Sequence, residues 1–294
     1  MSLAILDWGI GGVDFLLRLR ARHPDVPVIY WSDSGSTPYG KLGREALAAR
    51  VAAVAAALRD RGATRLVVAC NAASTVLGHP ALARTGLQVA GVIAPAIAAA
   101  LADPARSVGV IGGRRTIRSG LYRRALVAAG RRVHQRVAQP LSAMVERGEL
   151  DGPALAAELD RILAPLRRVD ALVLACTHYT ALLAPIRERL PRARVLDPAA
   201  ATLAHVERAW ALGPGRSDAA ATIGSSGQGR SDMSLTPGSS GQGRSDMSLT
   251  TGSSGQGRSD MFLTTGSPTA TRESARLAFG AALPAVERVE LPSG

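Results

Sequence analysis

Short apolar runs with the length of β-strands alternate with longer segments of helical periodicity along most of this chain. Residues 44–61, 116–129, 153–168 and 181–190 carry apolar side chains at helical spacing. Strands that alternate with helices in this way favour βαβ units and parallel sheets, so the sequence predicts an α/β fold. The predicted strands cover residues 3–6, 26–31, 66–69, 87–93, 108–111, 133–137, 172–175 and 194–196.

Two of these predicted strands end in nearly the same way. Residues 66–71 read Leu-Val-Val-Ala-Cys-Asn, and residues 172–177 read Leu-Val-Leu-Ala-Cys-Thr. This internal similarity predicts two related α/β lobes that each contribute one cysteine. In open α/β sheets, ligands bind beyond the carboxyl ends of the strands, so Cys70 and Cys176 lie where a binding site is expected.

Polar residues around the two cysteines make them candidates for chemistry. The chain has only two cysteines, and an unpaired buried cysteine is usually a small hydrophobic residue. His178, however, lies two residues after Cys176, where an imidazole can support a thiolate. Asp7 ends the first predicted strand, and a carboxylate there is costly to bury unless it hydrogen-bonds or acts on a ligand. Asn71 follows Cys70 at a predicted helix start, whose backbone N–H groups could bind a carboxylate.

The glycine-rich turn at residues 7–12 allows two interpretations. Its sequence, Asp-Trp-Gly-Ile-Gly-Gly, follows a predicted strand and could cradle a phosphate. The full dinucleotide-binding fingerprint is absent, and no P-loop lysine follows, so we favour a tight turn between a strand and a helix. Metal sites need more ligands at close spacing than two cysteines provide, so we also expect no metal site.

The formal net charge of +12 raises the question of a nucleic-acid partner. The excess is almost entirely arginine, since Lys41 is the only lysine, and the arginines are spread over the predicted helices. We therefore expect no nucleic-acid partner, whereas a small anionic substrate fits the charge. No window approaches the roughly 20 apolar residues of a transmembrane helix, and residues 1–7 do not form a basic leader. We expect a cytoplasmic protein with no membrane partner.

A 14-residue unit occurs three times in the last third of the chain, starting at Gly224, Gly238 and Gly252. Units so rich in glycine and serine bury too little apolar surface to offset the entropy of ordering. They predict a flexible surface insertion over residues 224–260. Only the last unit leads into an apolar segment, residues 261–266, which a predicted helix near residues 274–279 follows.

Several short motifs follow one another along the chain outside the repeats. They are Asp-x-Gly-Ile-Gly-Gly at 7–12, Pro38-Tyr39-Gly40, Cys70-Asn71-Ala72-Ala73-Ser74, Gly-Val-Ile-Ala-Pro at 91–95, Thr116-Ile117-x-Ser119-x-x-Tyr122, Val145-Glu146, Cys176-Thr177-His178-Tyr179 and Phe-Leu-Thr-Thr-Gly at 262–266. In this order they resemble the glutamate racemases of the aspartate/glutamate racemase family. The resemblance implies two flavodoxin-like parallel-sheet lobes, related by pseudo-symmetry, with a cleft between them. It assigns residues 1–94 and 206–294 to the first lobe and residues 95–205 to the second.

The same resemblance implies racemisation of L-glutamate to D-glutamate for peptidoglycan, with no cofactor. Cys70 and Cys176 would exchange protons with the substrate α-carbon from opposite faces. Two thiols suit this chemistry, because a single base could only return the proton to the face it left. The expected partners are a small anionic amino acid and, in a homodimer, a second copy of the chain. The assisting residues implied are Asp7 for Cys70, and His178 with Glu146 for Cys176; the implied substrate contacts are Trp8, Tyr39, Gly40, Asn71, Ala72 and Thr177.

Two positions depart from the family pattern and keep alternatives open. Trp8 and Ala72 stand where the family has serine and threonine, whose hydroxyls hold the substrate. A racemase of aspartate or another small amino acid is therefore one alternative, and a non-catalytic homologue that binds a ligand is another. A cysteine–histidine hydrolase would need one nucleophile and would leave the second cysteine unexplained.

Overall fold

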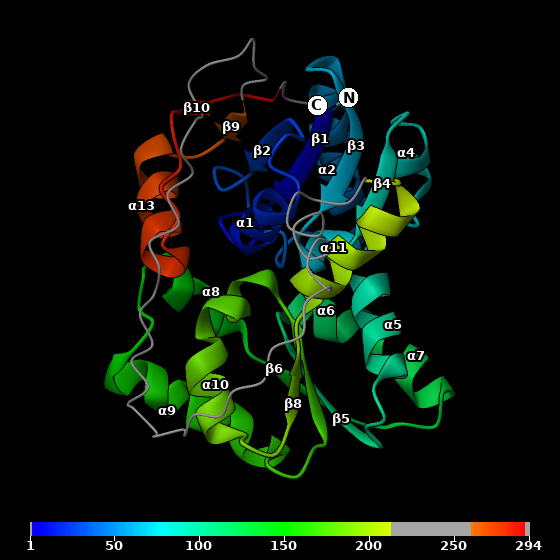
Figure 1. The fold of residues 1–294 in the computed structure, drawn as a ribbon, viewed down its shortest axis with the longest axis vertical. Coiled ribbons are helices and arrows are strands. Elements are labelled where there is room, and N and C mark those ends of the chain that lie inside the picture. Colours follow the sequence, from blue (N-terminus) through cyan, green and yellow to red (C-terminus); the bar gives the residue numbers. More distant parts are fainter. Residues whose placement is uncertain (1, 213–259, 292–294) are drawn as a thin grey trace, which may run out of the picture.

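The computed structural model describes residues 2–212 and 260–291, which form two parallel β-sheets with helices on their faces (Figure 1). The first sheet has six strands in the order β10-β9-β2-β1-β3-β4. Segments that are far apart in the sequence build this sheet together, because β9 pairs with β2. The strands are β1 (Ser2–Asp7), β2 (Val28–Ser32), β3 (Ala63–Val68), β4 (Gln88–Gly91), β9 (Met261–Thr264) and β10 (Val286–Arg288).

The second sheet has four strands in the order β6-β5-β7-β8. The order β2-β1-β3-β4 within the first sheet is the same arrangement, and it is the strand order of flavodoxin-like folds. The predicted α/β class and the two-lobe architecture are thus confirmed. The strands of the second sheet are β5 (Ser107–Gly112), β6 (Arg132–Val137), β7 (Ala171–Ala175) and β8 (Arg194–Leu196).

Each sheet has one face that packs only within its own lobe. On the first sheet this face is covered by α2 (Arg44–Asp60), α3 (Asn71–Ser74) and α4 (Pro80–Ala83). Strand β1 sends Ala4 and Leu6 into this cluster and Leu3 and Ile5 to the opposite face, because successive strand side chains alternate between faces. On the second sheet, α5 (Ile93–Ala102) and α7 (Leu121–Ala128) cover the corresponding face.

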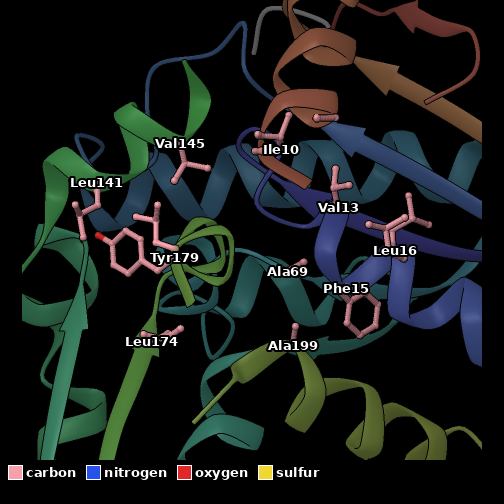
Figure 2. Close-up of a cluster of buried hydrophobic side chains, with 14 of the residues drawn as sticks. Ile10, Val13, Phe15, Leu16, Ala69, Leu141, Val145, Leu174, Tyr179 and Ala199 are labelled. Atoms are coloured by element: carbon pink, nitrogen blue, oxygen red, sulfur yellow. The ribbon is translucent and has the colours of Figure 1, made fainter. Parts of the chain in front are cut away.

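A third apolar cluster is shared by the two lobes. It joins Leu3 and Ile5 of the first sheet to Leu172 and Leu174 of the second. Figure 2 shows part of it, with Val13 and Leu16 from one lobe and Leu141, Val145 and Tyr179 from the other. The lobes are therefore packed against each other as well as joined by the chain. Helices that contribute are α1 (Val13–Arg22), α8 (Gln139–Glu146), α9 (Gly152–Leu163), α10 (Leu183–Arg189), α11 (Pro198–Ala209) and α13 (Pro268–Phe279).

Some predicted helices differ from the observed ones. Residues 116–129 form two helices, α6 (Arg114–Ser119) and α7, because Gly120 has a φ of +67° and ends α6 in the left-handed conformation. Residues 164–166 leave α9 as a 3₁₀ turn, η1 (Ala164–Leu166), and a second 3₁₀ segment, η2 (Thr177–Leu182), precedes α10. None of the helices in the described ranges has the length and apolarity that crossing a bilayer requires.

The segment after the repeats enters the first sheet. Strand β9 lies within the predicted apolar segment 261–266, and the helix expected near 274–279 is α13, which begins earlier, at Pro268. Asp260 fixes the start of β9, since it accepts hydrogen bonds from Val28 N at 3.1 Å and Arg20 Nε at 3.0 Å. The rest of the predicted insertion over 224–260 lies outside the described residues. The exact lobe boundaries stay predictions.

Candidate active site

A cleft of about 820 Å³ lies at the carboxyl ends of strands from both sheets. It is lined from the first lobe by the ends of β1 and β3 and from the second lobe by the end of β7 and by α8. The two sheets thus present equivalent edges to one space. All residues predicted for the site line it: Asp7, Trp8, Tyr39, Gly40, Cys70, Asn71, Ala72, Glu146, Cys176, Thr177 and His178.

The first-lobe thiol stands beside a buried carboxylate. Cys70 immediately precedes α3, and Asp7 is the last residue of β1 and is fully buried. Burial raises the pKa of Asp7, although the charge of His178 and hydrogen bonds from Thr177 and Trp8 N act in the opposite direction. Burial raises the pKa of the Cys70 thiol well above its usual value, and the charges of Asp7 and Cys176 raise it further. Burial and these charges therefore favour the thiol form of Cys70.

The second-lobe thiol stands beside an imidazole and a carboxylate. Cys176 follows β7, and its Sγ lies 3.8 Å from Nδ1 of His178. The other ring nitrogen of His178 lies 2.6 Å from Oε1 of Glu146, at the end of α8. Burial disfavours the charged imidazole, but hydrogen bonds to Cys176 and Glu146 and the charge of Glu146 outweigh it and raise the pKa of His178 well above its usual value. A protonated His178 can stabilise a thiolate at Cys176.

Glycines in the turn after β1 bring the two half-sites together. Thr177 Oγ1 donates to Asp7 Oδ2 across the lobes at 2.9 Å, and Ile10 N donates to Glu146 Oε1 at 3.2 Å. A Cβ atom on Gly11 would lie only 2.7 Å from His178 Nδ1 and 2.9 Å from Asp7 Oδ2. Glycine is required here because side chains of the second lobe approach so closely. The sequence alone did not reveal this role of the glycine.

Asn71 lines the cleft, and one end of its amide group is hydrogen-bonded to the other lobe. Its Oδ1 accepts a hydrogen bond of 2.7 Å from the hydroxyl of Tyr122, a fully buried side chain on α7 of the other lobe. Its Nδ2 is buried and has no partner within the described part of the chain. The hydrogen bond from Tyr122 therefore sets which end of the amide is the oxygen and which is the NH₂. The role of Tyr122 depends on a contact between lobes, which its sequence motif alone did not predict.

Tyr39 and Trp8, two other residues predicted to contact the substrate, use polar groups for hydrogen bonds within the protein. The Tyr39 hydroxyl donates to Asp33 Oδ2 at 2.8 Å, and Asp33 is in turn bound by Arg50. The indole N–H of Trp8 donates to Ser36 O at 3.2 Å. The half-buried ring lines the cleft and also packs on the apolar cluster of the first lobe.

Among residues 2–212 and 260–291, His, Cys, Asp and Glu side chains form no group of three or more that could hold a metal ion. The polar groups that do converge are the two thiols, the buried carboxylate of Asp7 and the hydrogen-bonded pair His178 and Glu146. This arrangement can accept a proton at one side of the cleft and donate one at the other.

Comparisons with known proteins show that this chain is similar to racemases. A family model described as Asp/Glu/Hydantoin racemase matches residues 15–206. A glutamate racemase from Aquifex aeolicus is 34% identical over 204 residues, which are 69% of this chain and 80% of that protein. One from Gloeobacter violaceus is 37% identical over 221 residues, 74% of this chain and 82% of that protein.

A solved structure extends the similarity to the whole fold. The crystal structure of glutamate racemase from Thermus thermophilus in complex with β-chloro-D-alanine matches with a TM-score of 0.74 at 28% identity, over 99% of this chain and 97% of that one. The family model covers more than half of the chain, and the relatives share both sequence and architecture with it. The chain therefore belongs to the Asp/Glu/Hydantoin racemase family, a family of isomerases.

Proposed function

We propose that this protein interconverts L- and D-glutamate, with Cys70 and Cys176 as its two proton-transfer groups and without a cofactor. The observation that carries the proposal is the placement of the two thiols. Each follows the equivalent strand of its own lobe, β3 or β7, and both line one cleft. Relatives that are 34% and 37% identical are glutamate racemases, which supports glutamate as the substrate. Supply of D-glutamate for peptidoglycan and a cytoplasmic location belong to the same proposal.

The proposed reaction moves one proton off the α-carbon and another onto it. One thiolate removes the α-proton and becomes a thiol, while the opposite thiol protonates the other face of the carbanion-like intermediate and becomes a thiolate. An amino-acid α-proton is a very weak acid, so both bases must be tuned by their surroundings. Asp7 acts on Cys70, and the pair His178 and Glu146 acts on Cys176.

Substrate entry completes the protonation state that catalysis needs. Burial and the charge of Asp7 favour the thiol form of Cys70. A substrate ammonium group that enters beside it favours the thiolate, because an opposite charge lowers a thiol pKa. The free NH₂ of Asn71 is suited to a substrate carboxylate. Trp8, Tyr39, Gly40, Ala72 and Thr177 supply the remaining walls.

Single-thiol variants in deuterium oxide test the mechanism. We expect Cys70→Ala and Cys176→Ala each to reduce racemisation by at least about 100-fold, the range of a lost acid–base group. A remaining thiol can still remove the α-proton that faces it and return deuterium to the same face. Each variant should therefore exchange the α-proton of one enantiomer only, and the two variants should prefer opposite enantiomers.

Proton NMR of L- and D-glutamate measures this exchange directly, and circular dichroism measures inversion. The double variant, with neither thiol, is the control and should exchange neither enantiomer. Full racemisation by either single variant would exclude the two-thiol mechanism. Inversion by the wild type without deuterium at the α-carbon of the product would exclude it as well.

A further inference from the structure

The side chain of Arg115 crosses the cleft from the second lobe to the first. It belongs to α6, is half-buried and lines the cleft. Its Nε donates to Thr75 Oγ1 at 3.1 Å, and its Nη1 donates to Leu42 O at 2.6 Å. Both acceptors are neutral. Within the described ranges, no carboxylate lies within ion-pair distance of Arg115.

Two other arginines that line the cleft, Arg147 and Arg161, are paired with acids. Arg147 bonds to Glu149 at 2.6 Å, and Arg161 bonds to Glu158 through Nε at 3.0 Å. The side chains of both arginines are more than half exposed, so water also solvates their charge. Arg115 thus differs from them in being less exposed and in having only neutral partners.

The charge of Arg115 is costly where it stands. A guanidinium stays protonated in proteins, and burying a charge without an opposite charge is unfavourable. Burial, together with the nearby charge of Arg44, lowers the pKa of Arg115, so the cation is less stable here than it is in water. A ligand that brings a negative charge into the cleft would remove this penalty.

Arg115 is also close to the reacting groups. Thr75 Oγ1, which accepts from Arg115, donates to the backbone oxygen of Ala72 at 2.6 Å. The guanidinium is therefore fixed against the short turn that begins right after Cys70 and contains Asn71. The same turn carries the unpartnered NH₂ of Asn71. Asn71 and Arg115, an amide and a cation that are both suited to carboxylates, thus both line the cleft and lie at the same turn.

We propose that Arg115 binds the side-chain carboxylate of the substrate and so makes this enzyme select amino acids with two carboxylates. The inference rests on the proposed racemase function and adds the residue that recognises the substrate side chain. Arg115 has a donor left for this contact, since its Nη2 has no hydrogen-bond partner within the described residues. The hydrogen bonds to Thr75 and Leu42 hold the guanidinium in place while Nη2 faces the ligand.

The test compares Arg115→Gln with Arg161→Gln, a matched loss of a paired cleft arginine. Racemisation of glutamate and of glutamine, which has a neutral side chain of the same size, is measured for each protein. We expect Arg115→Gln to lower kcat/KM for glutamate by about 10- to 100-fold, the range for a hydrogen bond to a charged group. Glutamine turnover should change less than about threefold, and Arg161→Gln should change neither.

A binding experiment separates this inference from the proposed reaction. Glutarate, which has two carboxylates and no α-amino group, is titrated calorimetrically into the wild type and Arg115→Gln. Weaker glutarate binding by the variant supports the role of Arg115 even if the wild type racemises nothing. If Arg115→Gln does not fold, Arg115→Lys takes its place, because it keeps the charge with fewer donors. It should show a smaller loss of kcat/KM, still larger for glutamate than for glutamine.

Two outcomes would overturn the proposal. An equal loss with glutamate and glutamine would mean that Arg115 only links the lobes through Thr75 and Leu42. Unchanged binding of glutarate to a folded Arg115→Gln variant would mean that the side-chain carboxylate is held elsewhere.

Discussion

At the scale of single residues, burial and a neighbouring carboxylate control the protonation of Cys70. Burial is the largest influence on its pKa, and the charge of Asp7 is the next. Both raise the pKa of Cys70 and so disfavour its thiolate. The backbone N–H groups of Ala73 and Trp8 act in the opposite direction without overcoming them.

The reactivity of Cys70 should therefore depend on Asp7. With Cys176 changed to serine, Cys70 is the only thiol, and its alkylation by iodoacetamide can be followed by mass spectrometry against pH. We expect little alkylation near pH 7 and a rise above pH 8.5. Adding Asp7→Asn removes a negative charge and should shift the curve to lower pH. The limiting alkylation rate at high pH is the control, because it reports how accessible Cys70 is to the reagent. A pH curve that does not shift in Asp7→Asn would contradict the influence of Asp7.

Trp8 should limit the space in the cleft and stabilise the first lobe. Trp8→Ser removes a ring that lines the cleft and donates to Ser36 O, and it supplies a hydroxyl in its place. We expect kcat/KM for glutamate to rise about tenfold relative to aspartate, the value of about one hydrogen bond. The free energy of unfolding should fall by about 1 to 3 kcal/mol. Unchanged relative efficiencies, with only the stability loss, would assign Trp8 to packing alone.

At the scale of elements, one hydrogen bond ties helix α7 of the second lobe to α3 of the first. Tyr122→Phe removes the donor to Asn71 Oδ1 without changing the packed ring. We expect KM for glutamate to rise about five- to tenfold with a smaller change in kcat, because the amide of Asn71 loses its fixed orientation. Adding Tyr122→Phe to Asn71→Ala should have no further effect. Full additivity of the two changes would show that Tyr122 does not act through Asn71.

Local sequence patterns predicted most strands and helices, but they could not predict contacts between the two lobes. The cysteines were located because each follows a buried strand, a signal contained in six consecutive residues. The break at Gly120 was missed because the apolar spacing continues through it, whereas the backbone there is left-handed. The contact of Arg115 with Thr75 joins residues 40 positions apart, and no local pattern contains it.

At the scale of the whole molecule, the repeats should be dispensable. Deleting residues 224–251 removes two of the 14-residue units and keeps the third, including Asp260, whose hydrogen bonds to Val28 N and Arg20 fix the start of β9. We expect the same thermal transition and the same kcat/KM, since loop length changes stability only slowly. Asp260→Ala is the contrast and should lower the transition. A deletion variant that loses its transition or its activity would show that the repeats are needed.

The hydrogen bond from Thr177 to Asp7 joins the two half-sites, each of which holds one thiol. On the two-thiol mechanism, this division of the site has a kinetic consequence. Each turnover leaves the proton on the opposite sulfur, so the enzyme that releases product is not the one that bound substrate. This second form is ready for the reverse reaction and must reset before it can repeat the forward one. When both enantiomers are abundant, resetting limits the net flux, and the sulfur that carries the proton records the direction of the last turnover.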